Sequence, residues 1–152
     1  MNIQRLPAGH PLPMSLLLAA DPDEARVLAY CQTGQVWVMG EAPIAGVVVF
    51  QALPEKEPTA EIKNIAIQPG LQGQGLGQQL LSFIKEEAQR QGILRLLVAT
   101  GNSSIGQLAF YQKAGFEMLR IDRHYFTRNY PFPIVENGIP CRHRVVLEHL
   151  LD

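Results

Sequence analysis

The sequence predicts an α/β fold, with one domain over residues 1–152 and a mixed, mostly antiparallel sheet flanked by helices. Three observations lead to this prediction. The chain has 152 residues, which is the usual size of one domain with its own core. Apolar segments with strand spacing and with helix spacing follow one another along the whole sequence. No internal repeat, low-complexity stretch or break in composition divides the chain.

The N-terminal part of the chain predicts one short strand followed by two helices. Residues 3–6 can form a short strand, which Pro7 and Gly9 would end. Residues 14–20 are almost wholly apolar and predict a first helix. A second helix is expected to begin with Asp21 as its cap and Pro22 at its first position, and to end near Cys31.

Three strands are predicted next. Residues 35–39 and 44–51 are apolar and rich in β-branched side chains, and the turn at 40–43 contains glycine and proline, so the two predict an antiparallel hairpin. The polar segment 53–58 is bounded by prolines and predicts a loop. Residues 60–67 are again apolar and predict the third of these strands.

The rest of the chain alternates helix and strand, with one long loop. The apolar spacing and the glycine or proline boundaries predict a helix at 76–91, a strand at 93–99, a helix at 104–114, a strand at 116–126, a structured loop at 129–140 and a final strand at 144–150. The last segment also fits a helix. With this order of elements, the sheet is mixed and helices are available to cover it.

Composition excludes several classes of function. A net charge of −1, with Lys and Arg scattered singly, gives no surface for nucleic acid. The longest apolar runs, 16–20 and 44–50, are too short to span a membrane. Cys31 and Cys141 lie far apart without metal-ligand spacing, so we expect reduced thiols, no metal and a cytoplasmic protein.

The most informative segment is the glycine-rich loop that precedes the helix at 76–91. Gly73, Gly75 and Gly77 allow close approach of a ligand, and the first N–H groups of the helix favour an anion such as phosphate. The spacing G-x-G-x-G differs from the dinucleotide fingerprint G-x-G-x-x-G, and no Gly-Lys-Ser/Thr of a P-loop is present. A plain connecting turn remains the structural alternative.

Two blocks of sequence resemble the GCN5-related N-acetyltransferase (GNAT) family. Gln72-x-x-Gly75-x-Gly77, after an Ile-Ala-Ile-x-Pro strand, is similar to the family's Q/R-x-x-G-x-G/A motif. The segment 109–116, Ala-Phe-Tyr-Gln-Lys-Ala-Gly-Phe, is similar to its A-x-x-F-Y-x-K-x-G-F region. The two blocks stand on either side of a predicted buried strand, as in the family. The resemblance implies the GNAT, or acyl-CoA N-acyltransferase, fold.

The resemblance also implies acetyl-CoA as co-substrate. Amides of the glycine-rich loop would bind its pyrophosphate, the strand before the loop would pair with the pantetheine arm, and Asn102 or Ser104 would add a contact, with the choice between these two left open. The implied cofactor-binding residues are Ile65, Ala66, Ile67, Gln72, Gly73, Gln74, Gly75, Leu76, Gly77, Asn102, Ser104 and Tyr111.

In this family an amine attacks the thioester directly and passes through a tetrahedral intermediate. The resemblance implies that Tyr111 is the general acid for the leaving thiolate. On its predicted helix Tyr111 shares a side with Ser104 and Gln107, away from an expected core face of Ile105, Leu108 and Ala109. The structural alternative is a tyrosine that packs at the rim of the core.

The general base is left open between Glu61, His124 and a water relay. The strand that contains Glu61 resembles that of family members in which a glutamate acts as the general base. In a regular strand, however, Glu61 would share a face with Lys63, Ile65 and Ile67. A β-bulge between the charged and apolar pairs would resolve this conflict. The structural alternative is an ion pair of Glu61 with Lys63. His124 is the rival base because imidazole titrates near neutral pH.

The predicted function is therefore transfer of an acetyl group from acetyl-CoA to an amine of a small molecule or protein. The acceptor pocket is expected near the first helices, the turn at 40–41, the strand at His124 and the loop at 129–140. One alternative is a catalytically silent acyl-CoA-binding regulatory module, and another is a nucleotide-binding protein of a different fold. A homodimer is possible by analogy with the family.

Overall fold

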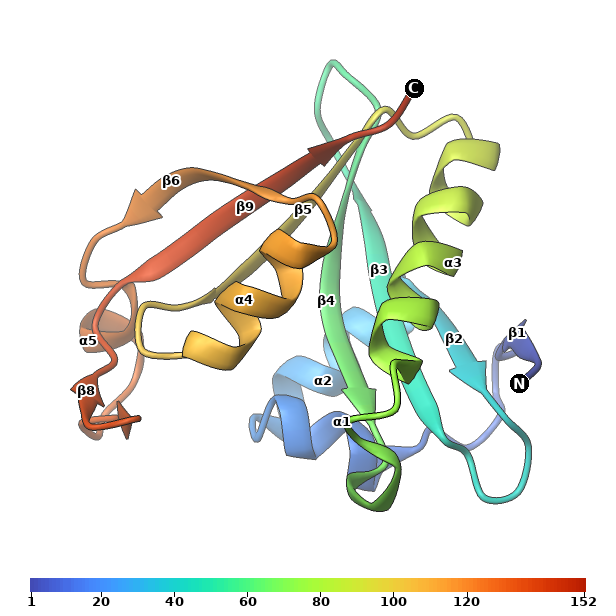
Figure 1. Ribbon diagram of the computed structural model, residues 1–152, viewed down its shortest axis with the longest axis horizontal. Coiled ribbons are helices and arrows are strands. Elements are labelled where there is room, and N and C mark those ends of the chain that lie inside the picture. Colours follow the sequence, from blue (N-terminus) through green and yellow to red (C-terminus); the bar gives the residue numbers. More distant parts are fainter.

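The computed structural model describes all residues 1–152 and contains a seven-stranded sheet with the order β1-β2-β3-β4-β5-β9-β6, plus a two-stranded sheet β7-β8 (Figure 1). The strands are β1 (Ile3–Arg5), β2 (Gln35–Met39), β3 (Gly46–Leu53), β4 (Thr59–Ile67), β5 (Arg95–Gly101), β6 (Glu117–Asp122), β7 (Val135–Glu136), β8 (Ile139–Pro140) and β9 (Arg144–Leu150). The helices are α1 (Met14–Ala20), α2 (Glu24–Thr33), α3 (Leu76–Arg90), α4 (Ile105–Lys113) and α5 (Tyr125–Asn129), and a 3₁₀ turn spans Pro69–Leu71.

The predicted mixed, mostly antiparallel sheet is confirmed. All neighbouring strands of the large sheet run antiparallel except β4 and β5, which are parallel. The strand interpretation of residues 144–150 is also confirmed, because β9 pairs with both β5 and β6. Its buried residues Val145, Val146 and Leu147 form the unbroken apolar run of a strand that is covered on both faces.

Two cores lie on opposite faces of the sheet. Figure 1 shows α3 on one face and α1 and α2 on the other. Val48 and Phe50 of β3 point to the larger core, which contains Leu80 of α3 and also Tyr111 of α4. The alternate residues of β3 point to a smaller core under α1 and α2. We refer to these as the α3/α4 face and the α1/α2 face.

The parallel strands β4 and β5 pair over only part of their length. Their register runs from Thr59 opposite Arg95 to Ile62 opposite Val98 and then stops. Beyond this point β4 continues to Ile67 without β5 as a partner, and the two strands separate (Figure 1). Backbone groups and side chains of both strands become available to a ligand here.

The predicted β-bulge in β4 is present at Lys63. On β3, Val49 and Phe50 are adjacent, but they pair with Asn64 and Ile62, so Lys63 is the extra residue. Ile62 and Ile65 consequently both reach the larger core, although they are three positions apart in the strand.

The bulge also brings Glu61 and Asn64 to one face of the sheet. Glu61 pairs with Gln51, whose side-chain amide donates to Thr33 of α2, which identifies the α1/α2 face. Asn64 donates to the Leu17 carbonyl of α1 on the same face. A regular strand would place residues 61 and 64 on opposite faces.

The start of α2 differs from the prediction. Asp23, rather than Asp21, is the N-cap, and its carboxylate accepts from the Arg26 N–H at 3.1 Å. Pro22 therefore lies before the cap and not at the first helical position. The Asp21 carboxylate does not cap the helix. Its Oδ1 accepts from the Asp23 N–H at 3.2 Å, and its Oδ2 accepts from the Tyr30 hydroxyl.

The predicted strand at 116–126 is too long. β6 ends at Asp122, and His124 has a φ of 59° as the residue before α5, so His124 does not lie in a strand. The loop that follows contains the short β7-β8 hairpin. Its turn residues Asn137 and Gly138 have φ values of 54° and 72°, which suits the Asn-Gly turn of a two-residue hairpin.

Candidate functional site

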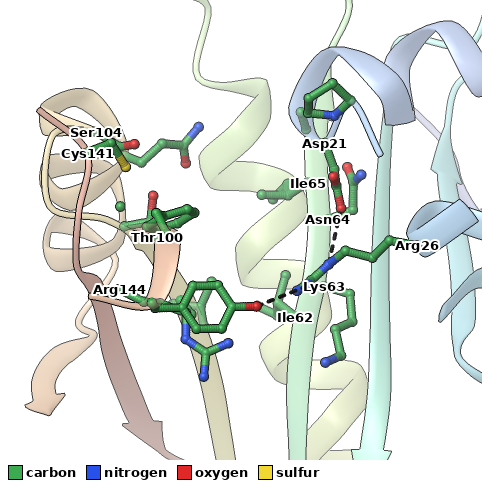
Figure 2. Close-up of a pocket in the computed structure, with 18 of the residues that line it drawn as sticks. Asp21, Arg26, Ile62, Lys63, Asn64, Ile65, Thr100, Ser104, Cys141 and Arg144 are labelled. Atoms are coloured by element: carbon green, nitrogen blue, oxygen red, sulfur yellow. Dashed lines mark hydrogen bonds and ion pairs between the residues drawn. The ribbon is translucent and has the colours of Figure 1, made fainter. Parts of the chain in front are cut away.

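A cleft of about 490 Å³ opens where β4 and β5 separate (Figure 2). In the view of Figure 2, Asp21, Arg26 and Asn64 lie along one wall, and Thr100, Ser104 and Arg144 lie along the other. The charged, amide, hydroxyl and thiol side chains that line it are Asp21, Arg26, Glu61, Lys63, Asn64, Thr100, Ser104, Gln107, Tyr111, Tyr125, Tyr130, Glu136, Cys141 and Arg144.

Tyr111 lines the cleft from the α3/α4 side. Its side chain is 5% exposed and packs edge-on against Phe116, with the ring centroids 5.9 Å apart. No protein group forms a hydrogen bond with the hydroxyl, and burial raises the pKa of Tyr111 well above that of an exposed tyrosine. The phenol is therefore protonated at neutral pH and has a hydrogen available for a ligand.

The surroundings of α4 are partly those predicted. Ser104, Gln107 and Tyr111 all line the cleft, as expected. The expected core face is only partly correct, because Leu108 packs against the larger core whereas Ile105 is 50% exposed and Ala109 is also exposed. The helix lies at the edge of the core, and it is anchored by Tyr111 itself together with partly buried neighbours, so both predicted properties of Tyr111, packing and access to the cleft, occur together.

Glu61 reaches the cleft from the α1/α2 face and forms an ion pair with Lys63. The Lys63 Nζ lies 3.0 Å from Oε1 of Glu61, and both side chains are about one fifth exposed, at 20% and 18%. The predicted structural alternative, an ion pair, is thus present alongside access to the cleft. Only Oε1 is engaged by Lys63, so the second carboxylate oxygen remains open to a ligand.

Asn64 is buried beside Glu61, and only one end of its amide is paired. Its Nδ2 donates to the Leu17 carbonyl and to the Tyr30 hydroxyl, both at 2.9 Å. The Leu17 carbonyl can only accept, so the amide nitrogen must face it and the orientation of the amide is fixed. Oδ1 is buried without a hydrogen-bond partner, which ordinarily costs about 1–3 kcal/mol.

From Asn64 a chain of hydrogen bonds leads to the charged rim. The Tyr30 hydroxyl donates to Asp21 Oδ2 at 3.1 Å, and the Arg26 Nε lies 3.5 Å from the same oxygen. Burial raises the pKa of Tyr30, so its hydroxyl keeps its hydrogen at neutral pH and can donate to Asp21. The relay holds Asn64 in position relative to α1 and α2.

The opposite rim is built around Arg144. Its guanidinium lies 2.6 Å from Asp122 and stacks over the Tyr125 ring, 4.0 Å from the centroid. The hydrogen bonds from Arg144 hold the pKa of Asp122 below its usual range. The Arg144 charge is thus neutralised by Asp122 within the protein.

A second cavity of about 260 Å³ continues the cleft toward the glycine-rich loop and shares Ala19, Ala20, Ile65 and Gln107 with it. Its lining contains the predicted pantetheine strand and part of the loop: Ile65, Ala66, Ile67, Gln72 and Gly77.

The loop itself has the conformation that an anion site requires. Gly73 and Gly75 both have φ of 79°, and a Cβ on Gly77 would meet the Phe110 ring at 3.1 Å. α3 starts at Leu76 without a side-chain cap, so its first N–H groups face the open side. The residues present therefore fit a phosphate-bearing ligand that extends along β4.

Asn102 does not line the cleft, and its side chain instead forms hydrogen bonds with the backbone. Its Oδ1 accepts from the backbone N–H groups of Arg142 and His143, and its Nδ2 donates to the Pro140 carbonyl. Ser104 does line the cleft, and its hydroxyl donates to Glu136 at 3.1 Å. These contacts join the β7-β8 hairpin to the start of α4.

His124 stands outside the cleft. Its backbone N–H donates to Nδ1 of His143 at 2.9 Å, and the two rings meet edge-on with centroids 4.8 Å apart. Partial burial, followed by the nearby charges of His124 and Arg123, lowers the pKa of His143. The structure brings Glu61 and Tyr111 together in one cleft and leaves His124 apart from them.

Sequence reasoning did not identify Asn64, Arg26, Tyr125 or Arg144, all of which line the cleft. Only Asn64 had a usable signal, because it is the one uncharged polar residue within the strand 60–67. The turn at 40–41, expected near the acceptor pocket, is not among the lining residues.

None of the helices of this protein combines the length and apolar character needed to cross a membrane.

Comparison with known proteins places the chain in a family. The model of the Acetyltransferase (GNAT) family matches residues 4–116. The uncharacterized N-acetyltransferase YvbK of Bacillus subtilis (strain 168) is 43% identical over 135 residues, which cover 87% of this chain and 84% of that protein.

Two solved structures agree with this match. A GNAT family acetyltransferase from Elizabethkingia anophelis with acetyl-CoA bound has a TM-score of 0.92 at 40% identity, covering 99% of this chain and 97% of that one. A Bacillus subtilis acetyltransferase in complex with CoA has a TM-score of 0.92 at 38% identity, covering 99% and 98%. The chain belongs to the GNAT family of acetyltransferases.

Proposed function

We propose that this acetyltransferase transfers an acetyl group from acetyl-CoA to a primary amine in the cleft, with Tyr111 as general acid and Glu61 as general base. One observation carries the proposal. Glu61 and Tyr111 line the same cleft from opposite faces of the sheet, at the place where β4 and β5 separate.

The donor is expected to occupy the α3/α4 side. The cavity next to the glycine-rich loop joins the cleft, and two similar structures contain acetyl-CoA or CoA. Backbone groups of Ile65, Ala66 and Ile67 would hold the pantetheine arm, and amides from Gln72 to Gly77 would hold the pyrophosphate. This arrangement directs the thioester toward Tyr111.

The acceptor is expected to approach from the α1/α2 face, where Glu61 lies. The lone pair of a neutral amine attacks the acetyl carbonyl carbon and forms a tetrahedral intermediate. Glu61 takes one proton from the amine nitrogen. When the carbon–sulfur bond breaks, its electron pair stays on sulfur, which takes the proton of Tyr111 and leaves as the thiol. The proton on Glu61 returns to Tyr111 through solvent, which restores both groups.

The raised pKa of Tyr111 affects the timing of its proton transfer. The sulfur of an intact thioester is scarcely basic, and burial makes the Tyr111 phenol a weaker acid, so proton transfer before the carbon–sulfur bond breaks is unfavourable. Tyr111 is therefore expected to donate a hydrogen bond to the sulfur first and to release its proton only as negative charge develops there.

Two experiments test this function. A thermal-shift comparison of acetyl-CoA with NAD and ATP should show stabilisation by acetyl-CoA alone, and the absence of a shift with any CoA ester would contradict the proposed donor.

An amine panel assayed by release of CoA should then identify acceptors. Tyramine, tryptamine, spermidine, agmatine and a peptide with a free N-terminus sample aromatic, cationic and protein-like amines. Turnover of at least one amine above the hydrolysis background is expected. Acetyl-CoA binding without turnover of any amine would instead favour the silent acyl-CoA-binding module.

A further inference from the structure

The further inference concerns Asn64, the one polar side chain lining the cleft that has a buried atom without a partner. Asn64 is 4% exposed, and its Oδ1 makes no hydrogen bond. The other buried atom without a partner, Nε of Arg95, lies outside the cleft. An unpaired buried carbonyl requires an explanation, and a ligand that pairs with it only when bound is one.

The position of Oδ1 is strictly determined. The Leu17 carbonyl requires the amide nitrogen on its side, and Tyr30 anchors the same nitrogen. The amide therefore cannot rotate to exchange its oxygen for a nitrogen, and what Asn64 offers to a ligand is an acceptor only. Any group that pairs with it must be a donor such as an N–H.

The β-bulge at Lys63 places this acceptor beside the proposed base. Glu61 and Asn64 share the α1/α2 face, whereas Tyr111 approaches from the other side. Glu61 and Asn64 both line the cleft, so a carboxylate and an unpaired amide oxygen belong to the same side of it.

We propose that Asn64 is the orienting residue of the acceptor subsite and that its Oδ1 accepts a hydrogen bond from the attacking amine. This inference rests on the proposed function. A neutral primary amine has one lone pair and two N–H groups. With one N–H directed to Glu61 and the other to Asn64, the lone pair is directed at the thioester carbon. The N–H held by Asn64 is the one that remains in the amide product.

This arrangement makes the enzyme selective for primary amines. A secondary amine has a single N–H, which Glu61 must remove, so Asn64 would remain unpaired or would meet the N-substituent. Replacement of Asn64 should therefore remove a substrate hydrogen bond only when the substrate is a primary amine. Acetyl-CoA binding should not depend on Asn64.

The test compares the best amine of the panel with its N-methyl derivative, for example tyramine with N-methyltyramine, in the wild type and in Asn64→Ala. For the primary amine, kcat/KM should fall about tenfold in Asn64→Ala, whereas for the N-methyl amine it should change less than twofold. The acetyl-CoA Kd should also stay within twofold. Thr59→Val, which alters another buried polar residue of β4 that does not line the cleft, is the matched control and should leave the ratio of the two amines unchanged.

Each other outcome contradicts the proposal in a recognisable way. Equal losses for both amines indicate a structural role for Asn64. A gain for the N-methyl amine alone indicates a steric wall, and a weaker acetyl-CoA Kd indicates a contact with the pantetheine amides. If Asn64→Ala does not fold, Asn64→Ser serves for the same comparison, because its hydroxyl keeps a polar group at the site. Turnover by the wild type separates failure of this inference from failure of the proposed function.

Discussion

Arg26 and Tyr125 meet across the mouth of the cleft, where Nη1 of Arg26 donates to the Tyr125 hydroxyl at 3.2 Å although 99 residues separate them in sequence. The contact joins α2 to α5. Arg144 stacks over the face of the same ring, 4.0 Å from its centroid. The hydrogen bond from Arg26 therefore connects two helices that both contribute residues to the lining of the cleft.

Tyr125→Phe should widen the acceptor side while preserving the stacked ring. Loss of one hydrogen bond at an exposed site corresponds to roughly a two- to tenfold effect, so we expect the KM for the amine to rise by that factor. The acetyl-CoA Kd and the thermal midpoint should remain close to those of the wild type. Thr127→Ala, on the same helix but not in the cleft lining, is the control. A change in acetyl-CoA affinity instead of amine KM would contradict this assignment.

Glu61→Gln should lower kcat by about 10²-fold, which is within the usual range for removal of a general base. Lys63→Met is the matched variant, because it breaks the same ion pair and leaves the carboxylate in place. If Glu61 serves as base, only Glu61→Gln loses activity, and the two variants lose a similar amount of stability, at most about 1 kcal/mol. Equal losses of activity in both variants would show that the ion pair, and not the base, is what matters.

Tyr111→Phe should bind acetyl-CoA normally and turn over at least 10²-fold more slowly. The ring remains packed against Phe116, and the lost hydroxyl has no hydrogen-bond partner in the protein, so the fold should tolerate the change. Isothermal titration with acetyl-CoA and single-turnover kinetics measure the two effects separately. Unchanged turnover would remove Tyr111 from the role of acid.

The same variant should alter how stability depends on alkaline pH. Burial raises the pKa of Tyr111 in the folded state, whereas the phenol of the unfolded chain ionises near pH 10. Below pH 10 both states are protonated and the contribution of Tyr111 is fully present. As the pH rises further, the unfolded state alone ionises, so the free energy of unfolding falls.

Between pH 9 and 11 the wild type should therefore lose about 1.4 kcal/mol more than Tyr111→Phe. Urea unfolding at both pH values measures this difference. Phe116→Leu removes core packing next to Tyr111 without removing a titratable group, so its cost should be the same at both values. Parallel loss in the wild type and in Tyr111→Phe would show that the hydroxyl is solvated in the folded protein.

Much of this site could be predicted from local sequence because its parts are local. The glycine spacing at 73–77 and the bulge implied by Glu61, Lys63 and Ile65 both follow from backbone requirements within a few residues. The strand prediction that included His124 failed, because the positive φ of a non-glycine residue leaves no reliable sequence signal.

The parts that could not be predicted depend on contacts distant in sequence. Arg26 and Tyr125 are single residues in helices, and nothing near either of them specifies the other. The partners of Asn102, backbone groups about 40 residues away, are equally invisible in its local sequence. Competing helix caps, such as Asp21 and Asp23, are decided by tertiary partners, because Asp21 also accepts from Tyr30.

A comparison of Gly75→Ala with Gly106→Ala distinguishes the effect of backbone conformation from the effect of the space available to an added Cβ. Neither glycine has an atom within 4 Å of an added Cβ, but only Gly75 has a positive φ, of 79°. Alanine at 75 is strained by about 1–2 kcal/mol, and relief of this strain would rotate the amides that begin α3. We expect at least fivefold weaker acetyl-CoA binding and lower stability. Alanine at 106, in the first turn of α4, should raise stability by about 0.5–1 kcal/mol and leave the acetyl-CoA Kd unchanged. Titration with acetyl-CoA and thermal unfolding measure both effects, and equal Kd values for the two variants would mean that the loop conformation does not form the donor site.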